Sequence, residues 1–167
     1  MRGVAVLIAL AATLAGCGLK PLYSGGSSGA VATALAGVEV APIAGKGGWL
    51  VANALRDRLG HDAPGSAARY RIDVRLDDSI TGLGARSDDS ITRERRTLRA
   101  RYQLIELATG NVVVDATAGS DAGVDVVGSE YATIAAENTA LERLSQVIAD
   151  QIVTRVALYA RRTAPTP

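Results

Sequence analysis

The most distinctive chemical group in this sequence is a lone thiol, Cys17, which follows directly on Leu14-Ala15-Gly16. A cysteine side chain can be acylated, and small residues just before it are typical of a signal-peptide cleavage region. The chain starts with a positive charge at Arg2 and continues in an apolar run from Val4 to Leu14. This arrangement predicts a secretory signal peptide over residues 1–16, with the cysteine as the first residue of the mature chain.

Leu14-Ala15-Gly16-Cys17 matches the lipobox of bacterial lipoproteins, in which the cysteine carries the lipid. An ordinary signal peptide gives no reason for a cysteine here, and an apolar run of about 11 residues is too short for a membrane helix of about 20. Two or more acyl chains, palmitate among them, would anchor the protein stably. Gly18, where an aspartate would retain a Gram-negative lipoprotein in the inner membrane, predicts an outer-membrane lipoprotein whose domain faces the periplasm.

The composition describes one neutral domain without disulfides. Eighteen basic residues face 17 acidic ones, and removal of Arg2 with the signal peptide makes the two signs equal. A neutral chain has no bulk attraction to nucleic acid, so a charged partner must be recognised by a local patch. We expect a lipidated N-terminus and flexible linker over 17–36, a single periplasmic domain over 37–161, and a disordered tail over 162–167.

The domain is predicted to begin with a strand and a helix. Gly37–Ala41 has the composition of a short strand, closed by Pro42. Apolar residues then recur at helical spacing over Gly48–Leu59, and Gly60 is a plausible stop. Trp49, the only tryptophan, is expected to anchor this helix in the core.

Two segments with strict alternation predict a long central hairpin. Apolar and polar residues alternate over Arg69–Asp77 and again over Arg93–Leu104, with Thr81–Ser90 expected as a turn or mobile tip. A tight turn at Thr109-Gly110-Asn111 leads into a further strand over Val112–Ala118. These segments form an antiparallel meander.

A long final helix is predicted over Ser129–Ala160, after a glycine-rich passage over Gly123–Gly128. Its expected apolar stripe includes Tyr131 and Ile134 near the start. The predicted fold is therefore α+β, with two helices packed on one face of a four-stranded, mainly antiparallel sheet in the order βαβββα.

The polar side of the predicted hairpin is unusually rich in arginine. Its arginines, interleaved with Asp73 and Asp77, are Arg69, Arg71, Arg75, Arg93, Arg95, Arg99 and Arg101. One interpretation is a solvated face whose ion pairs also discourage edge pairing. The other is a recognition surface, because arginine pairs well with phosphates and carboxylates. A phosphorylated glycolipid or the polar interior of a barrel fits such a surface better than nucleic acid, since no aromatic residues interleave with the arginines.

Signals of catalysis are nearly absent from the sequence. His61 is the only histidine and lies in a glycine- and proline-containing loop, and Asp88-Asp89 is typical of a turn. No metal-ligand cluster, nucleophile motif or phosphate loop is recognisable. We expect no enzymatic activity, no metal and no cofactor beyond the covalent lipid on Cys17.

As a whole, the mature chain resembles the LptE family of lipopolysaccharide-assembly lipoproteins, in its short α-proteobacterial form. The likeness depends on Cys17-Gly18-Leu19-Lys20-Pro21-Leu22-Tyr23, similar to the family's Cys-Gly-Phe-x-Pro-Leu-Tyr start, and on the βαβββα order with its long hairpin and final helix. Leu19 departs from the commoner phenylalanine. The resemblance implies a non-catalytic partner of the LptD outer-membrane β-barrel, which plugs the barrel, assists its assembly and helps to deliver lipopolysaccharide to the cell surface.

The resemblance also implies lipopolysaccharide contact through basic residues near the second and third strands. By location alone, the candidate contacts to lipopolysaccharide or the barrel are Arg86, Arg93, Arg95, Arg96, Arg99 and Arg101. Two alternatives remain open at this point. One is a periplasmic auxiliary lipoprotein that serves as a binding module of a lipid or solute transport system, and the other is a purely structural envelope lipoprotein.

Overall fold

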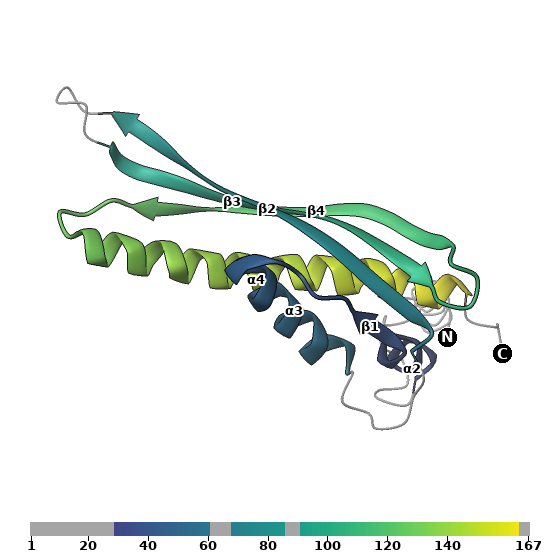
Figure 1. The fold of residues 1–167 in the computed structure, drawn as a ribbon. Coiled ribbons are helices and arrows are strands. Elements are labelled where there is room, and N and C mark those ends of the chain that lie inside the picture. The colour runs from purple at the N-terminus through teal and green to yellow at the C-terminus, as the bar shows by residue number, and fades with distance from the viewer. Residues whose placement is uncertain (1–28, 61–67, 86–90, 164–167) are drawn as a thin grey trace, which may run out of the picture.

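The computed structural model describes residues 29–60, 68–85 and 91–163. Its elements follow the order α2 (Ala30–Ala36), β1 (Val38–Val40), α3 (Gly45–Leu59), β2 (Tyr70–Ala85), β3 (Ile91–Glu106), β4 (Val112–Asp125) and α4 (Glu130–Thr163). The expected α+β architecture is confirmed, with the helices on one face of a four-stranded sheet (Figure 1). Cys17 and the predicted signal peptide, together with His61 and Asp88-Asp89, lie outside the described residues.

The sheet has the strand order β1-β2-β3-β4 and is antiparallel except at one edge. β2 and β3 pair from Tyr70↔Glu106 to Ala85↔Ile91, so the hairpin is even longer than its alternation predicted. β3 pairs with β4 over nearly the same length, whereas β1 pairs in parallel with only the first three residues of β2.

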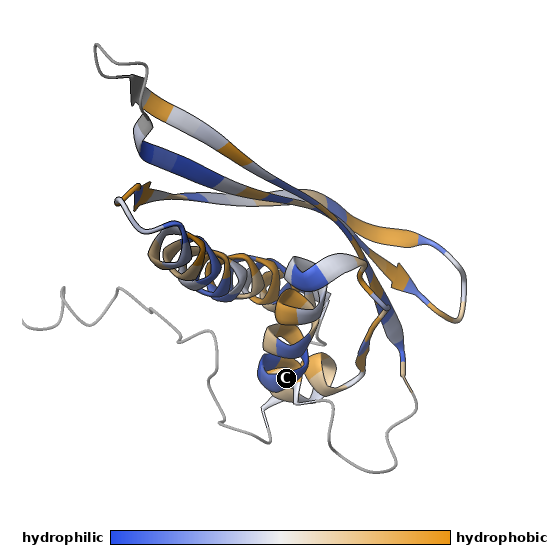
Figure 2. Ribbon diagram, turned by 60° about the vertical axis from the view of Figure 1, so that its left-hand side comes forward, coloured by the Kyte–Doolittle hydropathy of each residue, from blue (hydrophilic) through white to orange (hydrophobic). Residues whose placement is uncertain are grey.

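The core lies between this sheet and α4. The alternation predicted for β2 and β3 is confirmed, because Ile72, Leu98 and Leu104 are fully buried on the helix side. They pack with Ile148 and Ile152 of α4 in one hydrophobic cluster. Each buried side chain of this size contributes roughly 1.5–3 kcal/mol to stability. Figure 2 shows the helices on one side of the sheet, each with hydrophobic and hydrophilic residues along its length.

One helix was not expected from the sequence. Ala30–Ala36, which the sequence analysis placed in the linker, forms α2, with Val31 and Leu35 buried in the main core. α2 packs against α4, and its alanine-rich sequence favours a helix once such packing is available.

The expected anchoring role of Trp49 was wrong, since its side chain is 64% exposed. The reason lies next to it, at Gly48, which is buried so close to Ile43 that an added Cβ would be 2.5 Å from the Ile43 carbonyl oxygen. This approach turns Gly48 inward and the neighbouring tryptophan outward. Gly60 ends α3 as expected, in a left-handed conformation with φ of 67°.

The start of α4 also differs from the expected stripe. Tyr131 and Ile134 are 84% and 47% exposed, and Thr133 is buried in their place. At this level of the sheet β3 presents Glu94 and Arg96 to the helix side, so the apolar surface there is small and includes the buried Val124 of β4. The glycine-rich passage over Gly123–Gly128 belongs to strand β4 as far as Asp125, because this part of the chain pairs with the long β3. No helix among the described residues is long and apolar enough to cross a membrane.

Candidate functional site

The face of the sheet turned away from the helices carries the predicted arginines. We call this surface the open face. Its six exposed arginines on β2 and β3 are Arg71, Arg75, Arg93, Arg95, Arg99 and Arg101. They occupy odd-numbered positions, and the buried residues of the same strands occupy even ones. Arg69 precedes β2 and turns aside, because its guanidinium lies 5.2 Å from the ring centre of Tyr70.

Four arginines of the open face have acidic partners. Three pairs connect β3 to β4: Arg93–Asp125 at 3.6 Å, Arg95–Asp121 at 3.8 Å and Arg101–Asp115 at 3.1 Å. The fourth, Arg71–Asp73 at 2.9 Å, lies within β2. Hydrogen bonds from Gln103 and Arg101 hold the pKa of Asp115 below its usual range. Exposed pairs of this kind contribute only about 0–1 kcal/mol each, so their main effect is to orient the side chains.

Arg75 and Arg99 have no ion pair with any acid that the structure describes. Arg75 stands directly opposite Arg101 in the β2–β3 register, and like charges in such positions repel. All three arginines line one shallow depression of about 570 Å³, which also contains Asp77 and Thr117. The depression therefore has a net positive charge and suits an anionic group such as a phosphate.

Glycines on β4 determine how two of the arginines lie. Gly119 is opposite Arg99 in the register, and a Cβ added to it would be 2.5 Å from Nη1 of that arginine. The guanidinium of Arg93 lies in the same way near Gly123, where an added Cβ would be 3.1 Å from Nη2. Without side chains on β4 at these points, the long arginines can lie flat across the neighbouring strand.

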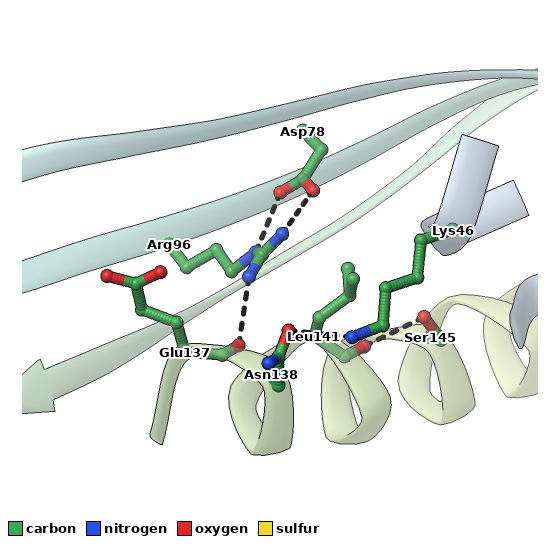
Figure 3. A network of polar contacts seen from close by, with 7 residues as sticks. All are labelled: Lys46, Asp78, Arg96, Glu137, Asn138, Leu141 and Ser145. Atoms are coloured by element: carbon green, nitrogen blue, oxygen red, sulfur yellow. Dashed lines mark hydrogen bonds and ion pairs between the residues drawn. The ribbon is translucent and has the colours of Figure 1, made fainter. Parts of the chain in front are cut away.

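Arg96 differs from the other candidate residues because it lies on the helix side of the sheet. Its side chain is only 11% exposed and donates to both carboxylate oxygens of Asp78 and to the Glu137 carbonyl, at 2.9 Å for the latter (Figure 3). The hydrogen bonds that Arg96 donates to Asp78 raise the pKa of the guanidinium. Arg96 therefore ties β2, β3 and α4 together. Side chains of a strand alternate between its two faces, and the even-numbered residues of β3 face the helices. The position of Arg96 in the sequence therefore already indicated the helix side.

Glu94 lies on the same side, and its Oε2 is buried without a hydrogen-bond partner among the described residues. Burial, followed by the nearby charge of Glu137, raises the pKa of this carboxyl. Of the remaining candidates, Arg93, Arg95, Arg99 and Arg101 are brought together on the open face, whereas Arg86 lies outside the described residues. Within the described part of the chain, no three histidine, cysteine or acidic side chains are placed to hold a metal ion.

Comparison with solved structures identifies the same fold in several bacterial lipoproteins. A protein from Caulobacter crescentus described as a lipoprotein has a TM-score of 0.65 and 26% identity, and the match covers 83% of this chain and all of that one. Rare lipoprotein B from Shewanella oneidensis has a TM-score of 0.60 at 9% identity, covering 75% of this chain and 96% of that one. A minor lipoprotein from Acinetobacter baumannii has a TM-score of 0.53 at 14% identity, covering 77% and 96%.

The comparison with curated proteins gave no match. Comparison with family models gave a match to LptE, described as lipopolysaccharide-assembly, over residues 35–156. This range includes β1, α3, the whole sheet and most of α4, which is well over half of the chain. The chain belongs to the LptE family of lipopolysaccharide-assembly proteins.

Proposed function

We propose that this protein is an outer-membrane lipoprotein that partners the LptD β-barrel in lipopolysaccharide transport and acts without catalysis. The observation that carries the proposal is the open face, an arginine-rich surface on a domain of the LptE family. The interior of an outer-membrane barrel is polar, so a plug that enters it must present a charged rather than an apolar face.

The depression around Arg75, Arg99 and Arg101 supports direct contact with lipopolysaccharide. Guanidinium groups form paired hydrogen bonds with phosphates. Neither Arg75 nor Arg99 forms an ion pair with an acid that the structure describes, although Asp77 lies opposite Arg99 in the register. We infer that this depression receives a phosphate of the glycolipid, with Arg93 and Arg95 extending the surface along β3.

The lipid anchor on Cys17 places the domain at the correct membrane in this proposal. It is supported by the lipobox sequence and by relatives that are themselves described as lipoproteins. A short tether before α2 would hold the open face close to the periplasmic mouth of a barrel.

The test replaces the two unpaired arginines together, Arg75→Ala with Arg99→Ala, and measures binding of purified lipopolysaccharide to the full-length protein. We expect at least a tenfold loss of affinity, since each lost charge-assisted bond contributes about 1.5–3 kcal/mol. The control is Arg143→Ala with Arg161→Ala, which removes the same charge from exposed positions on α4. An equal loss of lipopolysaccharide affinity in both double variants would show that only bulk charge matters, and it would contradict a specific site.

A further inference from the structure

The outer edge of β2 is paired at one end only. β1 occupies Tyr70–Ile72, and the last hydrogen bond from that side runs from the Ala41 N–H to the Ile72 carbonyl at 3.1 Å. Beyond this point no backbone group within residues 29–60, 68–85 and 91–163 bonds to β2 except from β3. We call Val74–Gly82 the free edge. Figure 1 shows this part of the hairpin extending past α3.

The free edge presents a regular row of backbone donors and acceptors. Successive residues of a strand direct their N–H and C=O groups to opposite sides. Tyr70 donates to the Gly37 carbonyl and Ile72 accepts from Ala41, so the even-numbered residues of β2 face outward. The outward groups of the free edge therefore belong to Val74, Leu76, Asp78, Ile80 and Gly82. Such a row is a template for an added strand.

At the opposite edge of the sheet, a side chain of α4 bonds to the backbone of one β4 residue. Gln151 of α4 accepts a hydrogen bond from the Gly119 N–H at 3.1 Å and donates to the Gly119 carbonyl at 3.3 Å. No described side chain blocks β2 in this way, and β2 contains neither the proline nor the lysine that commonly protects an edge. The outer edge of β4 is therefore capped at Gly119, whereas no described side chain bonds to the backbone of the free edge of β2.

Depressions lie on both sides of the free edge. On the open face, a depression of about 820 Å³ lies between the Ala41–Ala44 loop and Asp73–Leu76. On the helix side, a smaller one of about 210 Å³ lies beside Leu76 and Asp78, under the start of α3. An added strand directs alternate side chains to opposite faces, so its side chains would enter the two depressions in turn.

The linings of the two depressions indicate what kind of strand fits. In the larger depression Asp73 is paired with Arg71 and Arg101 with Asp115, which leaves Arg75 without an acidic partner among the described residues. The smaller depression is lined by charged and apolar side chains. Its charged groups are already paired, because Arg96 bonds to Asp78 and Lys46 donates to Asn138. The remaining side chains are apolar: Ala44, Leu76, Leu98 and Leu141. The fitting segment carries acidic residues toward Arg75 and apolar residues toward α3 and α4.

We propose that the free edge of β2 binds an extended segment of a partner polypeptide, alternately acidic and apolar, as a fifth strand. The proposal goes beyond the proposed function, because it concerns the backbone edge of β2, although Arg75 lines both this edge and the depression proposed to receive the glycolipid. It applies whichever protein supplies the strand.

The test uses full-length protein in detergent and a blocked decapeptide of alternating valine and glutamate, with a valine–lysine decapeptide as its control. Residue-resolved amide hydrogen exchange is measured with and without each peptide. We expect the glutamate peptide to slow exchange about tenfold at Val74, Leu76, Asp78 and Ile80, with no change at the odd-numbered amides already bonded to β3. The lysine peptide should have no effect.

Two variants locate the binding. Ile80→Pro removes one outward N–H but no bond to β3, so it should abolish the protection, whereas Ile80→Val should retain it. If the proline variant does not fold, Arg75→Glu serves instead, and it should reverse the preference between the two peptides. Because Arg75 also lines the glycolipid depression, this variant is judged by peptide protection alone and not by lipopolysaccharide affinity. Lipopolysaccharide affinity should not change in Ile80→Pro. A failure of the edge-binding proposal is therefore distinguishable from a failure of the proposed function.

Three results would overturn the proposal. The first is the absence of protection by the glutamate peptide, and the second is equal protection by both peptides or protection along β4. The third is protection of the even-numbered amides that grows with protein concentration without any peptide, because the occupant would then be a second copy of this chain.

Discussion

Arg99 lies across Gly119 of the neighbouring strand, in the space that a Cβ at that position would occupy. Its Cδ would be 2.8 Å from such a Cβ, so more than the tip of the side chain would have to move. The absence of a side chain at Gly119 therefore allows the guanidinium to lie within the depression that it shares with Arg75 and Arg101.

Gly119→Ala should lift Arg99 out of this position. We expect lipopolysaccharide affinity to fall several-fold with a loss of stability of about 1 kcal/mol, since the arginine can move and so relieve part of the overpacking. Titration with lipopolysaccharide and urea unfolding measure the two effects. Gly128→Ala is the matched control, because nothing lies within 4 Å of an added Cβ there. An unchanged affinity in Gly119→Ala would show that the position of Arg99 does not matter.

Asp78→Ala should destabilise the domain through Arg96. The substitution removes two of the three acceptors of a guanidinium that is largely enclosed between the sheet and α4, and leaves only the Glu137 carbonyl. Loss of hydrogen bonds to a charged group costs about 1–3 kcal/mol, which urea unfolding can resolve. Asp77→Ala, one residue away on the open face and without an ion pair among the described residues, should change the free energy of unfolding by less than about 0.5 kcal/mol. Equal effects would contradict the structural role of Arg96.

Glu94→Gln should stabilise the domain increasingly as the pH rises. The folded-state pKa of Glu94 is raised, so its protonated form is favoured in the fold, and the wild type loses stability as the pH rises through the folded pKa. Glutamine cannot ionise and can donate to Glu137. The difference in unfolding free energy between variant and wild type should therefore grow from acid to neutral pH. The control is Glu142→Gln, at an exposed position on α4. A pH-independent difference for Glu94→Gln would be the contrary result.

Cys17→Ala should separate folding from membrane attachment. The folded domain should persist, with an unchanged circular dichroism spectrum, whereas the protein should leave the membrane fraction because it has no lipid. Retention of the variant as an integral outer-membrane lipoprotein would contradict the lipobox interpretation.

Much of the fold could be predicted because the strands are half-buried. Strict alternation identified β2 and β3, and it placed the arginines of the open face correctly. Helical spacing and Gly60 gave α3 nearly its full length. These patterns are local consequences of burying one face of an element, so they are visible without any knowledge of the tertiary contacts.

What was missed depends on contacts between distant segments. Trp49 was expected inside, but the close approach of Gly48 to Ile43 turns it outward. α2 is helical because α4 covers Val31 and Leu35. The depression around Arg99 could not be predicted either, because it depends on the register between strands. Only the pairing of β3 with β4 brings Gly119 beneath Arg99.

Affinity purification tests whether this LptE-family domain is the partner of an outer-membrane barrel. Tagged full-length protein is recovered from detergent-solubilised outer membranes, and the proteins present in near-equal amounts are identified. We expect one large β-barrel of the LptD type at one copy per lipoprotein. Recovery of the lipoprotein alone, or with an inner-membrane transporter, would contradict it.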